Sequence, residues 1–187
     1  MAIPFLGRWL RRSSNPAWHS TVEQRAAGPE DAESQFNLGQ HLADVTAAVP
    51  DYAQAAAWYL KAAGQGHCAA QFQLGLLYGQ GKGVARNEAT AVTWLRQAAE
   101  LGHAGAQYHV GVKLYRASKS KRLSAASECR IEALKWLQLA TTQDYRGALS
   151  AREFVTLDMT WEEVDEGGRR AVAFAPGQAP SGGSSGE

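Results

Sequence analysis

Cysteine, net charge and long apolar runs are all scarce in this sequence of 187 residues. Its two cysteines, Cys68 and Cys129, are too few for a disulfide framework and indicate free thiols in a reducing compartment. A formal net charge of +1 argues against a general nucleic-acid binder, because such proteins present a strongly basic face. No apolar run approaches the ~20 residues of a membrane-spanning helix. The remaining composition is typical of one ordinary soluble domain.

Clusters of catalytic or metal-binding residues are also lacking. His67 and His103 occupy the same turn position in successive units, and His41 and His109 lack an identifiable third ligand. The glycine-rich segment 79–83 lacks the spacing of a phosphate-binding loop and follows a helical pattern instead of a strand. We therefore predict no catalytic, cofactor or metal site, and we expect the protein not to be an enzyme.

What the sequence does contain is a unit of two helices, in residues 68–103. Its second half places apolar residues on one helical stripe, formed by Ala91, Trp94, Leu95, Ala98 and Ala99. In its first half Gly75 removes a side chain where another helix can approach closely. Three alternating glycines in residues 79–84 suit a connection with positive φ. Because one thin helix pair cannot bury its own apolar face, the unit needs neighbours.

Those neighbours recur at a spacing of 36 residues. Toward the N-terminus Leu38-Gly39 repeats Leu74-Gly75, and Trp58 repeats Trp94. Toward the C-terminus Val110-Gly111 keeps the spacing, but Trp136 comes six residues late. The third unit therefore carries an insertion between its two helices.

These residues resemble the Sel1-like repeats, which are relatives of the tetratricopeptide repeats. The central unit matches the family pattern at Ala70, Leu74, Gly75, Tyr78, Gly81, Gly83, Val84, Ala91, Trp94, Ala98, Ala99 and Gly102. The first unit keeps Ala55, Trp58, Ala62 and Ala63 but lacks the tyrosine and the glycines. The third keeps Ala133, Trp136 and Ala140 and loses the glycine loop. The resemblance covers residues 21–174 and implies adaptors and assembly factors, often bacterial.

The expected fold is all-α, a right-handed α-solenoid of helix pairs. We predict an N-terminal arm in residues 1–20, a repeat domain in 21–174 and a disordered tail in 175–187. The repeat domain should hold a half-repeat cap at 21–27 and helix pairs at 32–43 with 52–64, 68–79 with 88–101 and 104–116 with 129–141. Helices at 146–157 and 161–173 should close it, with Ala148, Leu149 and Phe154 available for packing. The expected structural positions are Leu38, Gly39, Trp58, Leu74, Gly75, Tyr78, Trp94, Gly111 and Trp136.

Two segments carry concentrated positive charge. The inserted segment 117–130 could contact an acidic partner or phosphates, but its interleaved serines favour a solvated, mobile loop. The arm holds Arg8, Arg11 and Arg12 beside apolar residues, a composition that also fits a membrane-surface segment or a transit peptide. We favour an arm that packs on the first helix pair, because proline, glycine and serine interrupt any long helix.

The predicted function is a non-catalytic protein–protein interaction scaffold or adaptor that binds a peptide or partner protein on its concave face. The alternatives are a regulatory subunit of an enzyme complex or a hydrolase-like enzyme, and an assembly factor tethered to a membrane surface by the arginine-rich arm. We expect a cytoplasmic monomer with no cofactor and no nucleic-acid partner. The predicted partner-binding residues are Asn37, Gln40, His41, Gln73, Leu76, Leu77, His109, Val112 and Lys113.

Overall fold

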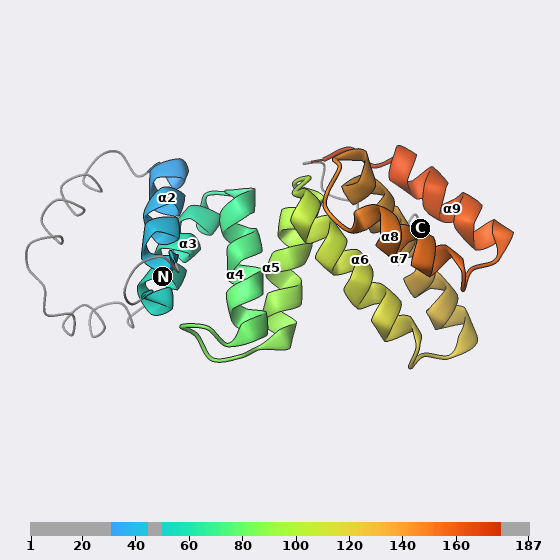
Figure 1. Cartoon of the computed structure of the whole chain (residues 1–187), viewed down its shortest axis with the longest axis horizontal. Coiled ribbons are helices and arrows are strands. Elements are labelled where there is room, and N and C mark those ends of the chain that lie inside the picture. The colour runs from blue at the N-terminus through green and yellow to red at the C-terminus, as the bar shows by residue number, and fades with distance from the viewer. Residues whose placement is uncertain (1–30, 45–49, 177–187) are drawn as a thin grey trace, which may run out of the picture.

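The structure, a computed structural model, describes residues 31–44 and 50–176. Within these ranges the regular structure is entirely helical. In chain order the helices are α2 (Ala32–Ala43), α3 (Tyr52–Gly64), α4 (Cys68–Gln80), α5 (Glu88–Glu100), α6 (Ala104–Ser118), α7 (Leu123–Thr142), α8 (Ala148–Thr156) and α9 (Trp161–Val172). Figure 1 shows them following one another along the length of the molecule, with α2 at one end and α8 and α9 at the other.

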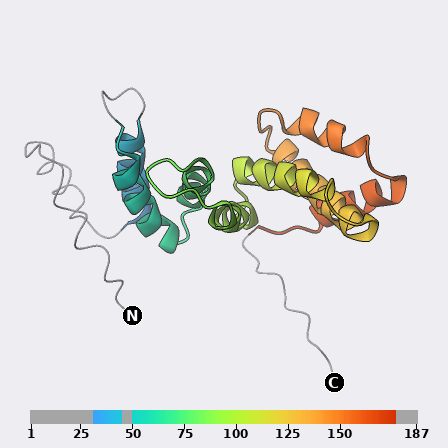
Figure 2. The same ribbon diagram turned by 90° about the horizontal axis from the view of Figure 1, so that it is seen from below.

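Consecutive helices form three hairpins, α2 with α3, α4 with α5, and α6 with α7. Neighbouring hairpins pack through α3 on α4 and α5 on α6, so the chain forms the predicted α-solenoid (Figures 1 and 2). A buried glutamine joins each hairpin to the one before it. The Gln71 side chain donates to the carbonyl of Ala63 at 3.3 Å, and that of Gln107 donates to Ala99 at the same distance.

Each hairpin has a glycine where its two helices cross. A Cβ atom on Gly39, Gly75 or Gly111 would lie 2.6–2.7 Å from the ring of Tyr59, from Leu95 Cγ or from Leu137 Cγ, respectively. Atoms cannot approach so closely, so the side chain opposite each glycine occupies the space that a Cβ would need. The three glycines therefore lie where the two helices of each hairpin approach each other closely.

Side-chain caps explain where the hairpins begin. His67 and His103 are the N-caps of α4 and α6, and each Nδ1 accepts the backbone N–H three residues later at 3.2 Å. Their rings stack on Phe36 and Phe72, with centroids 4.5 and 4.4 Å apart. Because Nδ1 accepts, Nε2 carries the hydrogen, and in His67 it donates to Glu33 at 3.0 Å. The shared turn position of the two histidines thus has a structural cause.

The prediction of a mobile loop in the third unit is wrong. Most of segment 117–130 is helical, because α6 continues to Ser118 and α7 begins at Leu123. Ala126 and Cys129 are buried, and Ser127 and Arg130 both donate to Glu163 on α9. The extension of α7 is therefore ordered by a helix that lies more than 30 residues further along the chain.

The last two helices pack on α7. Thr160 and Glu163 form the predicted capping box at the start of α9, and a Cβ on Gly167 would lie 2.9 Å from Leu134. Ala148 and Val155 are the buried residues of α8. Leu149 and Phe154 are 49% and 61% exposed, so neither is buried, although the ring of Phe154 contacts that of Tyr115 on α6.

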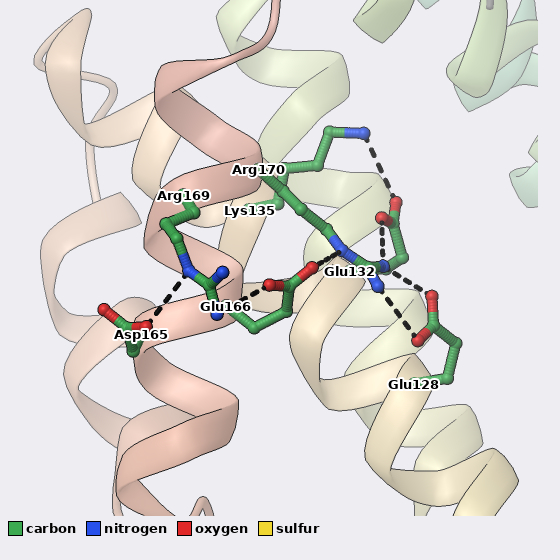
Figure 3. Close-up of polar contacts among 7 residues, drawn as sticks. All are labelled: Glu128, Glu132, Lys135, Asp165, Glu166, Arg169 and Arg170. Atoms are coloured by element: carbon green, nitrogen blue, oxygen red, sulfur yellow. Dashed lines mark hydrogen bonds and ion pairs between the residues drawn. The ribbon is translucent and has the colours of Figure 1, made fainter.

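Charged side chains also join α9 to α7. Figure 3 shows Arg170 of α9 reaching between Glu128 and Glu132 of α7, while Glu166 contacts both Arg170 and Arg169. The hydrogen bonds to Glu128 and Glu166 raise the pKa of Arg170 above its ordinary value. The guanidinium thus links two acidic positions on α7 to one on α9.

Some predicted core positions are less buried than expected. Leu74, Val110 and Trp136 are buried, whereas Leu38, Trp58 and Trp94 are half-buried. Leu38 lies on the first described helix, so no described hairpin precedes it. Trp58 lies under the ammonium of Lys61, 3.8 Å from the ring centroid, and Trp94 packs at the edge of the first core cluster. The arm (1–20), the half-repeat cap (21–27) and residues 177–187 of the tail lie outside the described residues.

Candidate functional site

A groove of about 560 Å³ runs between α2 and α4, the first helices of the first two hairpins. We call it the α2–α4 groove. Its walls come from these helices, its floor from Tyr59 of α3, and one end from the beginning of α3 and the glycine loop. The lining residues are Asn37, Gln40, His41, Ala43, Asp44, Tyr52, Tyr59, Gln73, Leu76, Leu77, Gln80 and Lys82.

The groove brings together six of the nine predicted partner-binding residues, namely Asn37, Gln40, His41, Gln73, Leu76 and Leu77. They share a surface because α2 and α4 are equivalent helices, so that positions 36 residues apart lie at corresponding places on each. Their common location is a structural fact, and their role in binding stays a prediction.

The other three predicted residues lie on α6 and do not line this groove. His109 packs between the rings of Phe72 and Tyr108, and burial followed by the nearby Lys113 lowers its pKa. Lys113 forms an ion pair with Glu88 at the start of α5, and Val112 packs against the third core cluster. These contacts hold the side chains to neighbouring helices, so the predicted surface is not continuous across three repeats.

Leu77 is one of the predicted partner-binding residues, but its side chain is not exposed. It is 6% exposed and packs in the first core cluster, where it forms part of the groove floor. Tyr59 forms the rest of the floor and is 2% exposed, and burial raises the pKa of its phenol to about 12. The floor is therefore closely packed and uncharged at neutral pH.

The sequence interpretation missed Tyr52 and Lys82 at the end of the groove. Gly83 brings them together, because a Cβ at this position would lie 2.3 Å from the backbone carbon of Tyr52. Gly81 and Gly83 both have positive φ, as the glycine pattern predicts. The Lys82 ammonium lies 5.5 Å from the Tyr52 ring centroid. The glycine pattern indicated that residues 79–84 form a loop with positive φ. It did not indicate that this loop contacts the start of α3.

The chemistry of the groove is that of a neutral polar surface. Four carboxamides line it, from Asn37, Gln40, Gln73 and Gln80, and each can donate and accept hydrogen bonds. The charged lining residues, Lys82 and Asp44, are of opposite sign. Among the lining residues within 31–44 and 50–176 there is no Ser, Thr or Cys, so this part of the lining offers no hydroxyl or thiol nucleophile apart from phenols.

Two other kinds of site are absent from the described ranges. Residues 31–44 and 50–176 hold no group of three or more His, Cys, Asp or Glu side chains placed to bind a metal ion. No helix in those ranges has the length and apolar character needed to cross a membrane. Stacked helical hairpins with a neutral polar groove define a repeat protein whose prominent surface feature is suited to binding.

Comparison with known families agrees with this class. The Sel1 repeat model matches residues 32–67, 68–103 and 130–145. The first two matches are complete hairpins of 36 residues, and the third covers only part of α7 because the insertion separates it from α6. The chain is a Sel1-repeat protein. Sel1 repeats commonly serve in protein–protein interaction, and proteins of this fold are generally non-catalytic scaffolds.

Solved structures show the same fold. A protective antigen of uropathogenic Escherichia coli strains, which displays an SLR fold, is 25% identical with a TM-score of 0.65 over 83% of this chain and 36% of that one. A Sel1 repeat protein from Oxalobacter formigenes is 26% identical with a TM-score of 0.54 over 70% of this chain and 93% of that one. The present chain thus spans about a third of the length of the antigen. A search of curated proteins gave no match.

Proposed function

We propose that this protein is a non-catalytic interaction scaffold that binds an extended peptide segment of a partner protein in the α2–α4 groove. The observation that carries the proposal is the groove itself, where four carboxamides surround a floor of Leu77 and Tyr59. Carboxamides pair well with the N–H and C=O groups of a peptide backbone, and the apolar floor can hold a side chain.

The charge of the groove supports a peptide over a charged polymer. Lys82 and Asp44 lie within one lining, and the rest of it is neutral, so no single sign of field dominates. A nucleic acid would require several cations to neutralise its phosphates. A groove of about 560 Å³ also has the size of a site for a few residues instead of a whole domain.

The experiment uses the full chain and a displayed library of random peptides. Peptides that bind are resynthesised with a fluorescent label, and their Kd is measured by anisotropy. A groove variant combines Gln73→Ala, His41→Ala and Leu76→Glu, and a matched control combines Gln97→Ala and Thr93→Ala on the exposed face of α5. We expect the groove variant to weaken binding at least about tenfold and the control to leave it unchanged.

Helical circular dichroism and melting temperature should stay the same in both variants, since Gln73 and Leu76 are only half-buried and His41 is exposed. Selected peptides that bind the groove variant with wild-type Kd would refute the α2–α4 groove as the binding surface.

A further inference from the structure

Six large apolar side chains are exposed between residues 123 and 172, and four of them lie near the start of α7 or near the connection between α8 and α9. Their exposed fractions are 83% for Leu123, 61% for Phe154, 81% for Leu157 and 77% for Trp161. We call these four residues the C-terminal apolar patch. Exposed apolar side chains are ordinary when scattered singly, so the first question is whether these four lie together.

Contacts around Asp158 bring two of them together. The Tyr115 hydroxyl and the Lys119 ammonium both donate to the Asp158 carboxylate, which joins the end of α6 to the connection between α8 and α9. The ring of Phe154 meets that of Tyr115 edge to face, with centroids 5.8 Å apart. Leu157 directly precedes Asp158, so Phe154 and Leu157 both lie next to the contact between the end of α6 and the α8–α9 connection.

The other two lie at the neighbouring starts of α7 and α9. Ser127 of α7 donates to Glu163 of α9, which places these two helix starts side by side. Leu123 is the first residue of α7, four residues before Ser127, and Trp161 is the first residue of α9, two residues before Glu163 and four after Leu157. In Figures 1 and 2 the α6–α7 turn and the α8–α9 connection both lie at the end of the molecule away from α2.

The rim of this patch has two halves of opposite charge. Arg116 and Arg122, beside the α6–α7 turn, and Glu153 and Glu162, on α8 and α9, form no ion pair within the described part of the chain. A two-fold axis through the patch places the basic half of one copy against the acidic half of the other. A surface with this arrangement is self-complementary, as an isologous interface requires.

In place of the monomer expected from the sequence alone, we propose that the C-terminal apolar patch is the contact surface of a symmetric homodimer. At these exposed fractions the four side chains present on the order of 500 Å² of apolar surface, near the upper range for a typical monomer. Two such patches with their charged rims bury roughly 1,000 Å² or more, the lower limit for a specific interface. An interface at this lower limit is typical of weak, transient association, so we expect a Kd in the micromolar range or weaker.

Other occupants fit the structure less well. Pro176, the last described residue, lies against Gly102 next to the start of α6, and Asp31 begins the described chain at the opposite end of the molecule (Figure 1). Both terminal segments of the chain are therefore attached to described residues that lie away from the patch. An anionic membrane surface would be opposed by Glu153 and Glu162 on the rim. A second copy of the chain offers an acidic half to the basic half of the first copy, and a basic half to its acidic half.

The test is sedimentation velocity of the full chain over a range of concentrations up to several hundred micromolar. The variant Leu157→Glu with Trp161→Glu places carboxylates in the centre of the proposed contact, and Val172→Glu is the matched control at the other end of α9, where Val172 is 90% exposed. We expect the wild type and the control to dimerise with equal Kd and the double variant to dissociate at least about tenfold more easily.

A second pair of variants tests the two-fold arrangement. Arg122→Glu alone should weaken the dimer, because it places carboxylates against the acidic half of the partner copy, and adding Glu153→Arg should recover part of the loss. A wild type that stays monomeric, a dimer that the double variant does not weaken, or a monomer that binds anionic vesicles through the patch would each overturn the proposal. The patch is remote from the α2–α4 groove, so either proposal can fail without the other.

Discussion

The two complete repeats in residues 32–103 and the C-terminal region in residues 104–176 are held together by different interactions. The repeats rely mainly on neutral contacts, namely glycines at helix crossings, small buried alanines, histidine caps and glutamine–carbonyl bonds, with His67 to Glu33 as a contact to a charged group. In the C-terminal region α7 is surrounded by α6, α8 and α9, and arginine–glutamate pairs fasten α9 to it. The regular repeats are thus held mainly by neutral contacts between segments within about 36 residues of each other. The C-terminal region depends in addition on charged side chains from distant parts of the sequence.

Removing Arg130 should give the largest effect on this comparison. Glu163 is 7% exposed, so Arg130→Met leaves a buried carboxylate with Ser127 and its own helix start as remaining donors. We expect a loss of about 3 kcal/mol in the free energy of unfolding, measured by urea denaturation. The control Arg169→Met removes a guanidinium that is 67% exposed and should cost less than about 1 kcal/mol. Equal losses in the two variants would contradict a special role for the buried pair.

The same pair predicts how stability changes with pH. Burial raises the pKa of Glu163, but hydrogen bonds from Arg130 and Ser127 outweigh it and hold the pKa below its ordinary value of 4.5. A carboxyl with a lowered folded pKa stabilises the fold above pH 4.5, and this contribution disappears as the pH falls below that value. The loss caused by Arg130→Met should therefore shrink when the urea titration is repeated in acid.

The repeat region should respond most to its crossing glycines. Gly75→Ala forces a Cβ to within 2.6 Å of Leu95 Cγ and 3.3 Å of the Ala91 carbonyl oxygen, and we expect it to cost about 2 kcal/mol. The matched control is Gly64→Ala in the last turn of α3, where a Cβ would meet no atom within 4 Å. Alanine is the better helix former, so the control should stabilise by about 0.5 kcal/mol. Thermal melts in which both variants behave alike would contradict the close crossing.

The smallest effect concerns a difference between the two repeats themselves. In the first repeat Gln65 donates to the amide oxygen of Gln35 at 3.0 Å, but Leu101 stands at the position 36 residues after Gln65. In the second repeat the buried Oε1 of Gln71 has no hydrogen-bond donor within the described chain. Leu101→Gln should supply one and raise the free energy of unfolding by about 1 kcal/mol.

A control for that substitution is Leu60→Gln, because Leu60 and Leu101 are 41% and 40% exposed. Leu60→Gln removes a comparable apolar surface without reaching a buried acceptor. A gain in stability from both variants, or from neither, would show that the amide oxygen of Gln71 is not the cause.

Part of the α2–α4 groove could be predicted from the sequence. The spacing of 36 residues identified equivalent positions on the first helices, so Asn37 and Gln73 were predicted to share a surface, as they do. The spacing could not show that Tyr59 would form the floor of the α2–α4 groove, because this depends on the Tyr59 ring occupying the space beside Gly39. Nor could it separate His109 and Lys113 from that surface, since their contacts with Phe72 and Glu88 are made between hairpins.

The sequence by itself determined the helical hairpins, their order and the glycines at their crossings, because these depend on periodicity, capping and backbone freedom within about 36 residues. Only the tertiary structure decided the course of segment 117–130, whose serines and basic residues favour a loop on local criteria. There Glu163 of α9 accepts from Ser127 and Arg130, and burial of Ala126 and Cys129 completes the helix. Local polarity cannot reveal such an outcome, because the stabilising partner is supplied by a distant part of the chain.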